Sequence, residues 1–265
     1  MIKLIKKILF NKTFHSWLWL AVLLIIWEIA SRLGLVNAYI LPSFSKVALR
    51  TINELFYGNL GIQTLNSMRI ILMGFTLSFI LAALITLLCE WFRPIESLIN
   101  MLSTILSPLP SVAIMPLVIM WFGIRTGAMF VLIIHGVLWA LVRHILDGMR
   151  AIPQVYREWG QNIGLSSWKM FSGITLFAIM PEFLAGVRVG WARAWRALVS
   201  AEMVFGLIGQ YGGLGFYVHT NRSYANLTNV MAGVIIISLI GILMESVVFK
   251  QIERHTIRKW GMSYE

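Results

Sequence analysis

Long apolar stretches separated by short polar segments dominate the hydropathy pattern of this chain. Four of them run for 17 to 28 residues without Asp, Glu, Lys or Arg: Ile70–Cys89, Ser97–Ile124, Thr126–Val142 and Tyr224–Met244. A helix that crosses a bilayer needs about 20 mostly apolar residues. Two further stretches, Trp17–Leu33 and Met180–Phe205, are apolar but contain charged residues. The pattern predicts an all-α polytopic membrane protein with six transmembrane helices.

Composition supports the membrane assignment. The chain is 58% hydrophobic and 12% charged, with a mean hydropathy of +0.80, whereas soluble domains carry roughly a quarter charged residues. The formal net charge of +11 does not indicate a nucleic-acid partner, because the basic residues are not gathered into one polar patch. The single cysteine, Cys89, excludes a disulfide within the chain and is interpreted as a helix-packing residue.

The basic residues instead follow the membrane topology. If the N-terminus is cytoplasmic and six helices alternate, the inner segments hold thirteen Lys and Arg and the outer segments six. This bias predicts that both termini and the 143–180 loop lie in the cytoplasm. The expected organisation is a basic tail at 1–15, a membrane domain at 16–250 containing a cytoplasmic loop at 151–181, and a second tail at 251–265.

Two segments between the spans carry local signals. Pro42 and Ser43 resemble a helix start, and the apolar residues that follow, up to Phe56, recur at nearly helical spacing, which predicts a short amphipathic helix on the outer surface. In the third predicted span, Pro108, Pro110 and Pro116 would each bend a helix. Such breaks are tolerated in bilayers where neighbouring helices or a watery cavity satisfy the backbone. A kinked structural helix and a helix that lines a pathway both remain open.

The segment 156–181, YREWGQNIGLSSWKMFSGITLFAIMP, interrupts the apolar pattern on the predicted cytoplasmic side. Pro153 suits the first position of a helix of two or three turns. In that helix Val155 and Trp159 lie four residues apart on one face, and Gly164 permits an ending in the left-handed conformation. Such a helix is suited to docking into a groove of a cytoplasmic partner. A loop that follows the membrane surface fits the pattern equally well.

The same segment resembles the EAA loop of permease subunits of bacterial ABC importers, whose pattern is Glu-Ala-Ala, three residues, Gly, nine residues, Ile, one residue, Leu-Pro. Glu158 and Gly164 stand at the family spacing, as do Ile174 and Leu176. Pro181 matches a second proline common in the alkanesulfonate, taurine and nitrate branch. Five ordered motifs extend the similarity: LPSFSKV at 41–47, NSMRIILMGF at 66–75, SPLPSVAIMPLVIMWFGI at 107–124, GVRVGWARAWRALVSAEM at 186–203 and GGLGF at 212–216.

The resemblance implies a type I ABC importer permease fold and a division of labour among subunits. Two permease copies would form the pathway, two separate ATP-binding subunits would bind below them, and a periplasmic or lipid-anchored solute-binding protein would deliver the solute. The short helix would be the coupling helix that enters a cleft of the ATPase. The residues implied in coupling are Val155, Arg157, Glu158, Trp159, Gly164 and Pro181.

No catalytic residue, metal site or cofactor is expected in this chain. It has no G-x-x-x-x-G-K-[ST] phosphate loop, so ATP and Mg²⁺ would be used by the partner ATPase. The chain departs from the family pattern at Trp159-Gly160, where two alanines are usual, and at Phe177, where the first proline is common. Trp159 would then fill a partner cleft shaped for it or anchor the loop at the lipid headgroups.

Charged residues inside the fifth predicted span need partners or a watery cavity. Arg188 and Glu202 share a helix face but lie about 21 Å apart at 1.5 Å per residue, so they cannot pair. We expect Arg188 to approach Glu245 near the cytoplasmic end of the sixth span. The candidate pathway residues are Arg188, Arg193, Trp195, Arg196, Glu202, Pro110 and Pro116.

Two interpretations of Arg193 and Arg196 remain. They line the pathway and favour an anion such as a sulfonate, taurine, nitrate or bicarbonate, or they pair structurally with backbone carbonyls or Glu28. His135, a lone histidine on an apolar helix, is expected to be packed or hydrogen-bonded. The alternative functions are a lipid-modifying membrane enzyme and an ion-gradient-driven secondary transporter. The first would need catalytic spacing of acidic and His residues, and the second would need repeated halves; neither pattern is found.

Overall fold

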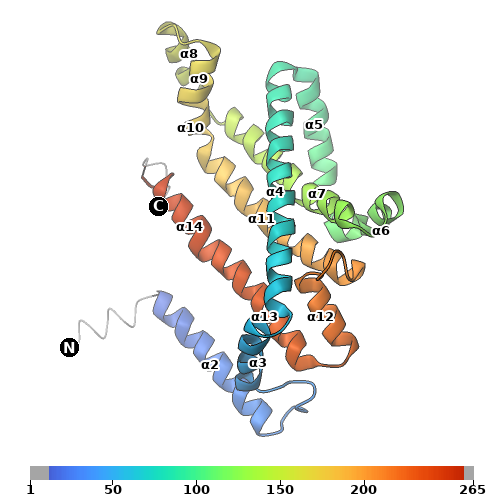
Figure 1. Ribbon diagram of the computed structural model, residues 1–265. Helices are drawn as coiled ribbons and strands as arrows, with labels where there is room; N and C mark the ends of the chain where they lie inside the picture. The colour runs from blue at the N-terminus through green and yellow to red at the C-terminus, as the bar shows by residue number, and fades with distance from the viewer. Residues whose placement is uncertain (1–11, 260–265) are drawn as a thin grey trace, which may run out of the picture.

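The computed structural model describes residues 12–259, and every regular element in that range is helical (Figure 1). In chain order the elements are α2 Lys12–Arg32, α3 Phe44–Phe56, α4 Leu60–Trp91, α5 Arg93–Leu106, α6 Ser111–Phe122, α7 Thr126–Arg150, α8 Gln154–Asn162, α9 Ser167–Met170, the π-helical segment η1 Phe171–Thr175, α10 Leu176–Ala178, α11 Met180–Phe205, α12 Leu214–Ser223, α13 Leu227–Leu243, the π-helical segment η2 Met244–Phe249, and α14 Lys250–His255. The remaining parts of the two expected tails, 1–11 and 260–265, lie outside the described residues.

Helix α7 forms the centre of the bundle and packs against both α4 and α11 (Figure 1). Of its most apolar window, 67% is buried, against 22% for the helix Leu227–His255. Leu132, Ile133 and Val137 of α7 are completely buried. The apolar side chains that remain exposed on the outer helices are suited to contact with lipid, which is as apolar as they are.

Glycines bring α11 close to α7. A Cβ atom on Gly186 would meet the His144 side chain at 2.8 Å, and one on Gly190 would meet the Val137 side chain at 3.2 Å. Small residues at a seam between membrane helices let the two backbones approach closely, where dispersion contacts hold them together. The pair α7 and α11 therefore forms a close-packed unit on which the other helices assemble.

The expected six spans are not confirmed for residues 12–259. Three helices are long and apolar enough to cross a membrane: α4, α7 and the continuous helix Leu227–His255. Two bent pairs raise the number to five if each is one span, α5 with α6 and Trp168–Ala178 with α11. The remaining expected span corresponds to α2, which is not among the helices that meet this criterion in the described residues.

The third predicted span, Ser97–Ile124, is not a single helix. Helix α5 ends at Leu106, α6 begins at Ser111, and the bend between them is 105°. Pro108 and Pro110 lie in the break, where proline removes a backbone donor and disfavours helical geometry in the residue before it. The kink expected from the prolines is therefore a near-perpendicular turn inside the apolar stretch.

The amphipathic helix predicted after Pro42 and Ser43 is confirmed as α3, and Glu28 of α2 holds its first turn. The Glu28 carboxylate accepts the backbone N–H of Ser45 at 3.0 Å and its hydroxyl at 2.8 Å, and it also accepts Arg32 Nε at 2.6 Å. An acid at a helix N-terminus satisfies a free amide and complements the helix dipole. Glu28 is thus occupied and is not the partner of an arginine in the fifth predicted span.

Candidate functional site

The predicted cytoplasmic helix exists as α8, and its side chains project into solvent. Pro153 precedes the helix in an extended conformation, with ψ of 136°, so it is the N-cap and not the first helical residue. Val155 is 52% exposed and Trp159 71% exposed. Gly164 has φ of +70°, the left-handed ending that its position predicts. The side chain of Arg157 lies outside the described part of the structure.

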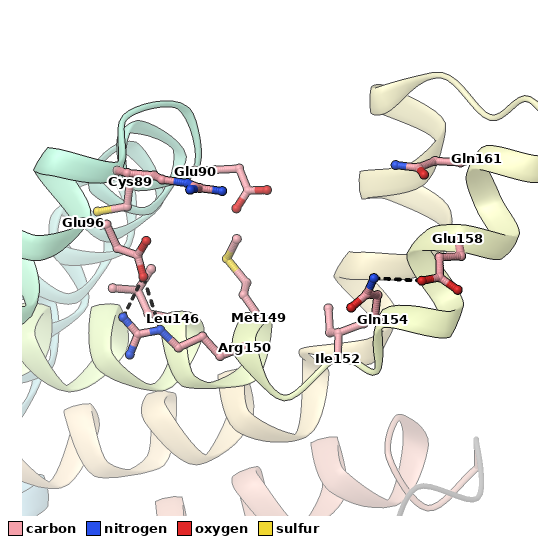
Figure 2. Close-up of a pocket in the computed structure, with 11 residues that line it drawn as sticks. Cys89, Glu90, Glu96, Leu146, Met149, Arg150, Ile152, Gln154, Glu158 and Gln161 are labelled. Atoms are coloured by element: carbon pink, nitrogen blue, oxygen red, sulfur yellow. Dashed lines mark hydrogen bonds and ion pairs between the residues drawn. The ribbon is translucent and has the colours of Figure 1, made fainter.

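A cavity of about 690 Å³ separates α8 from the turn between α4 and α5 (Figure 2). On the α8 side, Gln154 donates through Nε2 to the Glu158 carboxylate at 2.8 Å. On the other side, Arg150 at the end of α7 forms an ion pair with Glu96 of α5 at 2.6 Å. The end of α7 is therefore tied to α5, whereas the polar face of α8 stays separate from both across the cavity.

The chain returns from α8 to the bundle through α9, η1 and α10, and then bends by 61° into α11. Pro181 stands in the first turn of α11, where its missing N–H costs no hydrogen bond. Gly160 of α8 lies against this returning segment, because a Cβ there would meet Met170 and Ile174. A displacement of α8 would thus press on the segment that leads into α11.

A second cavity, of about 570 Å³, lies where the α5–α6 break faces α7 and the middle of α11. Its lining brings together four of the candidate pathway residues, Pro110, Arg193, Trp195 and Arg196, and adds His135. Pro116, Arg188 and Glu202 are not in this lining. His135 Nδ1 lies 3.4 Å from Ser111 Oγ, which fits the expectation of a hydrogen-bonded histidine.

Both arginines contact backbone carbonyls. Arg193 donates through Nη1 to the carbonyl of Ser107 at 3.3 Å and to its hydroxyl at 3.1 Å. Arg196 donates through Nε to the carbonyl of Ala192, one turn earlier in α11, at 3.1 Å. These carbonyl contacts agree with the structural interpretation. Both side chains also line the cavity, which leaves the pathway interpretation as a prediction.

The predicted approach of Arg188 and Glu245 is confirmed. Arg188 Nε lies 3.0 Å from a Glu245 carboxylate oxygen, and Nη2 lies 3.9 Å from Glu253. Glu245 belongs to η2, a π-helical segment of the kind that often occurs at functional positions. The ion pair therefore ties the N-terminal half of α11 to the last long helix, Leu227–His255.

Glu202 lies at the other end of α11 and is 1% exposed. Its carboxylate accepts the Ser67 hydroxyl at 2.7 Å and the backbone N–H of Gly215 at 2.8 Å. Gly213 must be glycine here, because a Cβ would collide with the carboxylate. Glu202 thus fastens the start of α12 to α4 and serves as a structural anchor.

Sequence reasoning missed the hydroxyl partners of the charged residues. Ser67 holds Glu202 across 135 residues of sequence, and Ser107 holds Arg193 across 86. Serines inside apolar stretches are common in membrane helices, where they also bond to their own backbone. Ser67 and Ser107 both lie within motifs of the family pattern, but nothing in the sequence indicated that Ser67 contacts Glu202 or that Ser107 contacts Arg193.

Helix α12 carries a buried phenol, Tyr217. Burial and, after it, the nearby Glu54 carboxylate raise the pKa of Tyr217 above its usual value. Tyr217 therefore stays neutral and acts as a packing residue. Within residues 12–259, no group of three or more His, Cys, Asp and Glu side chains could hold a metal ion.

Comparison with known proteins agrees with this architecture. Residues 74–257 match the family described as binding-protein-dependent transport system inner membrane component. The chain is 29% identical over 250 residues to the putative aliphatic sulfonates transport permease protein SsuC of Bacillus subtilis (strain 168), covering 92% of this chain and 87% of that protein.

Two further relatives cover similar lengths. The taurine transport system permease protein TauC of Escherichia coli (strain K12) is 25% identical over 90% of this chain and 93% of its own length. The formylaminopyrimidine transport permease protein ThiX of Halalkalibacterium halodurans is 27% identical over 85% of this chain and 88% of its own length. These relatives are permease components of transport systems, and none of their names describes an enzyme.

Three observations point to the same class of protein. They are the exposed helix α8 between the core helices α7 and α11, the broken span α5–α6 beside a charged cavity, and the family match over most of the helical bundle. The chain therefore belongs to the binding-protein-dependent transport system inner membrane components, the non-catalytic membrane permeases of ABC importers.

Proposed function

We propose that this chain forms the translocation pathway of an ATP-driven importer and that α8 is its coupling helix. The observation that carries the proposal is the exposure of α8: Trp159 is 71% exposed at the predicted cytoplasmic end of the molecule. An exposed Trp on a short helix is suited to filling a pocket in a partner, and Trp is enriched among residues that dominate binding energy. The partner would be one of two ATP-binding subunits, which would use ATP and Mg²⁺.

The connections of α8 support a mechanical role. The helix lies between α7 and α11, and its Gly160 lies against Met170 and Ile174 of the segment that enters α11. A rigid push on α8 would therefore reach the two central helices of the bundle. In the assembled importer, a second copy of the permease would complete the pathway, and a periplasmic or lipid-anchored binding protein would supply the solute. Both termini would be cytoplasmic.

The solute is proposed to be a small organic or inorganic anion, such as a sulfonate, taurine, nitrate or bicarbonate. Relatives named for aliphatic sulfonates and taurine support this class, although another relative is named for formylaminopyrimidine. The two arginines in the lining of the 570 Å³ cavity also support it, because fixed positive charge favours anions in a pathway.

Site-specific crosslinking tests the coupling role. In a Cys89→Ser background, Trp159→Cys should crosslink to the cognate ATP-binding subunit in membranes, and the yield should change when ATP and vanadate are added. The matched control is Trp168→Cys on α9, because Trp168 is 73% exposed but lies outside α8. Absence of any ATPase crosslink at position 159, or solute uptake insensitive to vanadate, would reject the proposal and favour a secondary transporter or a membrane enzyme.

A further inference from the structure

The cavity of about 570 Å³ beside the α5–α6 break has walls from four separate parts of the fold. Residues 107–112 of the break form one wall, His135 and Gly136 of α7 a second, residues of α11 a third, and Ile237 of α13 closes part of the remainder. Gly136 makes the enclosure possible, since a Cβ there would approach Ser111 Oγ at 3.3 Å and Arg193 at 3.5 Å.

The charge of this cavity is one-sided. Its lining contains Arg193 and Arg196 but no Asp or Glu. Neither arginine takes part in an ion pair within the described residues. In contrast, Arg188, which precedes both of them in α11, pairs with Glu245. A guanidinium inside an apolar bundle needs an anion or several hydrogen-bond acceptors to offset its desolvation. The cavity therefore lacks a protein counter-charge for its two cations.

The two arginines are satisfied to different degrees. Arg193 is half-buried and places Nη1 on both the carbonyl and the hydroxyl of Ser107, directly after the last residue of α5. A cation at a helix C-terminus satisfies free carbonyls and complements the helix dipole. Arg196 is exposed, and the only side-chain hydrogen bond that it makes to a described residue is from Nε. Its terminal Nη groups thus remain available to a ligand.

The broken span adds further donors to the same wall. Helix α6 begins at Ser111 after Pro110, so the positive end of its dipole lies at the lining of the cavity. Hydroxyls of Ser111 and Ser200 also belong to the lining. In transporters, half-helix N-termini at a break near the membrane midplane commonly face anionic groups of the solute. The arginine charges, the serine hydroxyls and the N-terminus of α6 are all groups that can bind the oxygen atoms of an anion. Together they suit a planar or tetrahedral oxyanion.

We infer that this cavity is an oxyanion-binding site inside the permease, in which Arg196 contacts the anion and Arg193 is a positioning residue. Arg193 holds the α5–α6 break against α11 and so fixes the wall that faces Arg196. The inference deepens the proposed function, because it assigns separate roles to the two arginines in selecting the solute. A carboxylate or sulfonate would accept from both Nη groups of Arg196 in the bidentate geometry that guanidinium favours.

The test measures the electrostatic preference of the cavity without needing the natural solute. In the Cys89→Ser background, Ser200→Cys places one thiol in the lining of the full-length chain in membrane vesicles. Its modification rate is compared for two thiosulfonate reagents of similar size, one with a sulfonate group and one with a quaternary ammonium group. We expect the anionic reagent to react about tenfold faster, the lower end of electrostatic focusing in a low-dielectric cleft.

Variants at Arg193 and Arg196 then distinguish the charge that attracts the anion from the contact that positions the cavity wall. Arg196→Gln should reduce the preference to nearly equal rates, and Arg196→Lys should retain most of it because the charge remains. Ethanesulfonate added to the Ser200→Cys protein should compete for the cavity and slow modification of the thiol. Arg193→Lys should retain the charge preference but lose this protection, since the wall is no longer held by the contacts of Arg193 with Ser107. Val204→Cys is the control position, because Val204 is 59% exposed near the outer end of α11 and is not in the lining.

Three results would overturn the inference. The first is an unchanged preference in Arg196→Gln, and the second is the same preference at Val204→Cys. The third is failure of both reagents to modify Ser200→Cys and also Val112→Cys, a second lining position, because a cavity closed to such reagents cannot hold a solute anion. None of these measurements involves an ATPase, so failure here is distinguishable from failure of the coupling role of α8.

Discussion

The two turns that flank α11 are built in opposite ways. At its C-terminal end, on the predicted outer side, residues 206–213 (the outer turn) fold back onto α4, where Gln63 donates to the carbonyl of Tyr211 at 2.8 Å and Asn66 to that of Gly212 at 2.6 Å. Buried Glu202 completes this attachment. At its N-terminal end, on the predicted cytoplasmic side, the turn containing α8 (the inner turn) leaves Val155 and Trp159 exposed and faces an open polar cavity.

This difference shows which end of α11 is completed within the chain. The outer turn satisfies its polar groups with residues of α4, so its conformation is fixed by the permease itself. The inner turn keeps its apolar side chains uncovered, so covering them requires another molecule. Burial of exposed apolar side chains is the usual source of association energy. Helix α11 therefore connects an outer turn that is fixed by contacts within the chain to an inner turn whose apolar side chains are free to bind another molecule.

Removing the Glu202 side chain, which anchors the outer turn, should have the largest effect, and this effect should be on stability. Glu202→Ala leaves the Ser67 hydroxyl and the Gly215 amide without their partner in a buried environment. Because unsatisfied buried polar groups are costly, we expect a loss of about 3 kcal/mol in the free energy of unfolding. Denaturant unfolding in detergent micelles measures it. The matched control is Glu182→Ala at the inner end of α11, an exposed acid that should cost less than about 1 kcal/mol; equal losses would contradict the comparison.

Truncating the inner turn should have the second largest effect, on association and not on folding. Trp159→Ala removes an indole that is 71% exposed in the isolated chain. We expect about thirtyfold weaker binding of the ATP-binding subunit, or about 2 kcal/mol, with an unchanged free energy of unfolding. Trp168→Ala on α9 is the control and should bind normally. Titration of the ATPase onto permease in nanodiscs would reveal whether the two tryptophans instead behave alike.

The glycine that ends α8 offers a smaller change. Gly164 has φ of +70°, and no atom lies within 4 Å of the position that a Cβ would take, so Gly164→Ala tests backbone strain alone. A left-handed conformation costs a residue with a Cβ about 1 kcal/mol, and we expect that loss in stability. Gly173→Ala, also in open space but within η1, should be neutral or slightly stabilising. A Gly164→Ala protein of unchanged stability would show that the turn can relax.

The smallest effect is expected at the ion pair between α11 and η2. The side chains of Arg188 and Glu245 are 40% and 57% exposed, so the pair should contribute less than about 1 kcal/mol. Arg188→Glu should lower stability and uptake slightly, and the double variant Arg188→Glu with Glu245→Arg should restore both. A double variant no better than the single one would indicate that Arg188 depends on Glu253 instead.

The sequence predicted the helices whose position depends only on the residues within one continuous stretch. The fifth predicted span, Met180–Phe205, coincides with α11, and α3 and α8 occur where local spacing placed them. The ion pair between Arg188 and Glu245 was also predictable, because depth in the membrane follows from position along each span. These features depend on periodicity and length, which a sequence displays directly.

The features that join distant residues were not predictable. The stretch 97–124 contains no charged residue, so its composition does not show a 105° turn, and the proline positions indicate a bend without its direction. That direction depends on contacts such as the one between Arg193 and Ser107, 86 residues apart. The contacts of the two charged residues of α2 were likewise not predictable: Glu28 pairs with Arg32 and accepts hydrogen bonds from Ser45, 17 residues away.

The glycine seam between α7 and α11 has a consequence for how the molecule can change shape. At Gly186 and Gly190 the backbone of α11 lies directly against the His144 and Val137 side chains of α7, so the two helices cannot slide past each other without collisions. If α8 is the coupling helix, as proposed, a load on it would move α7 and α11 together as one rigid body. The break between α5 and α6, which lacks a continuous helical backbone, would then be a place where the bundle can bend.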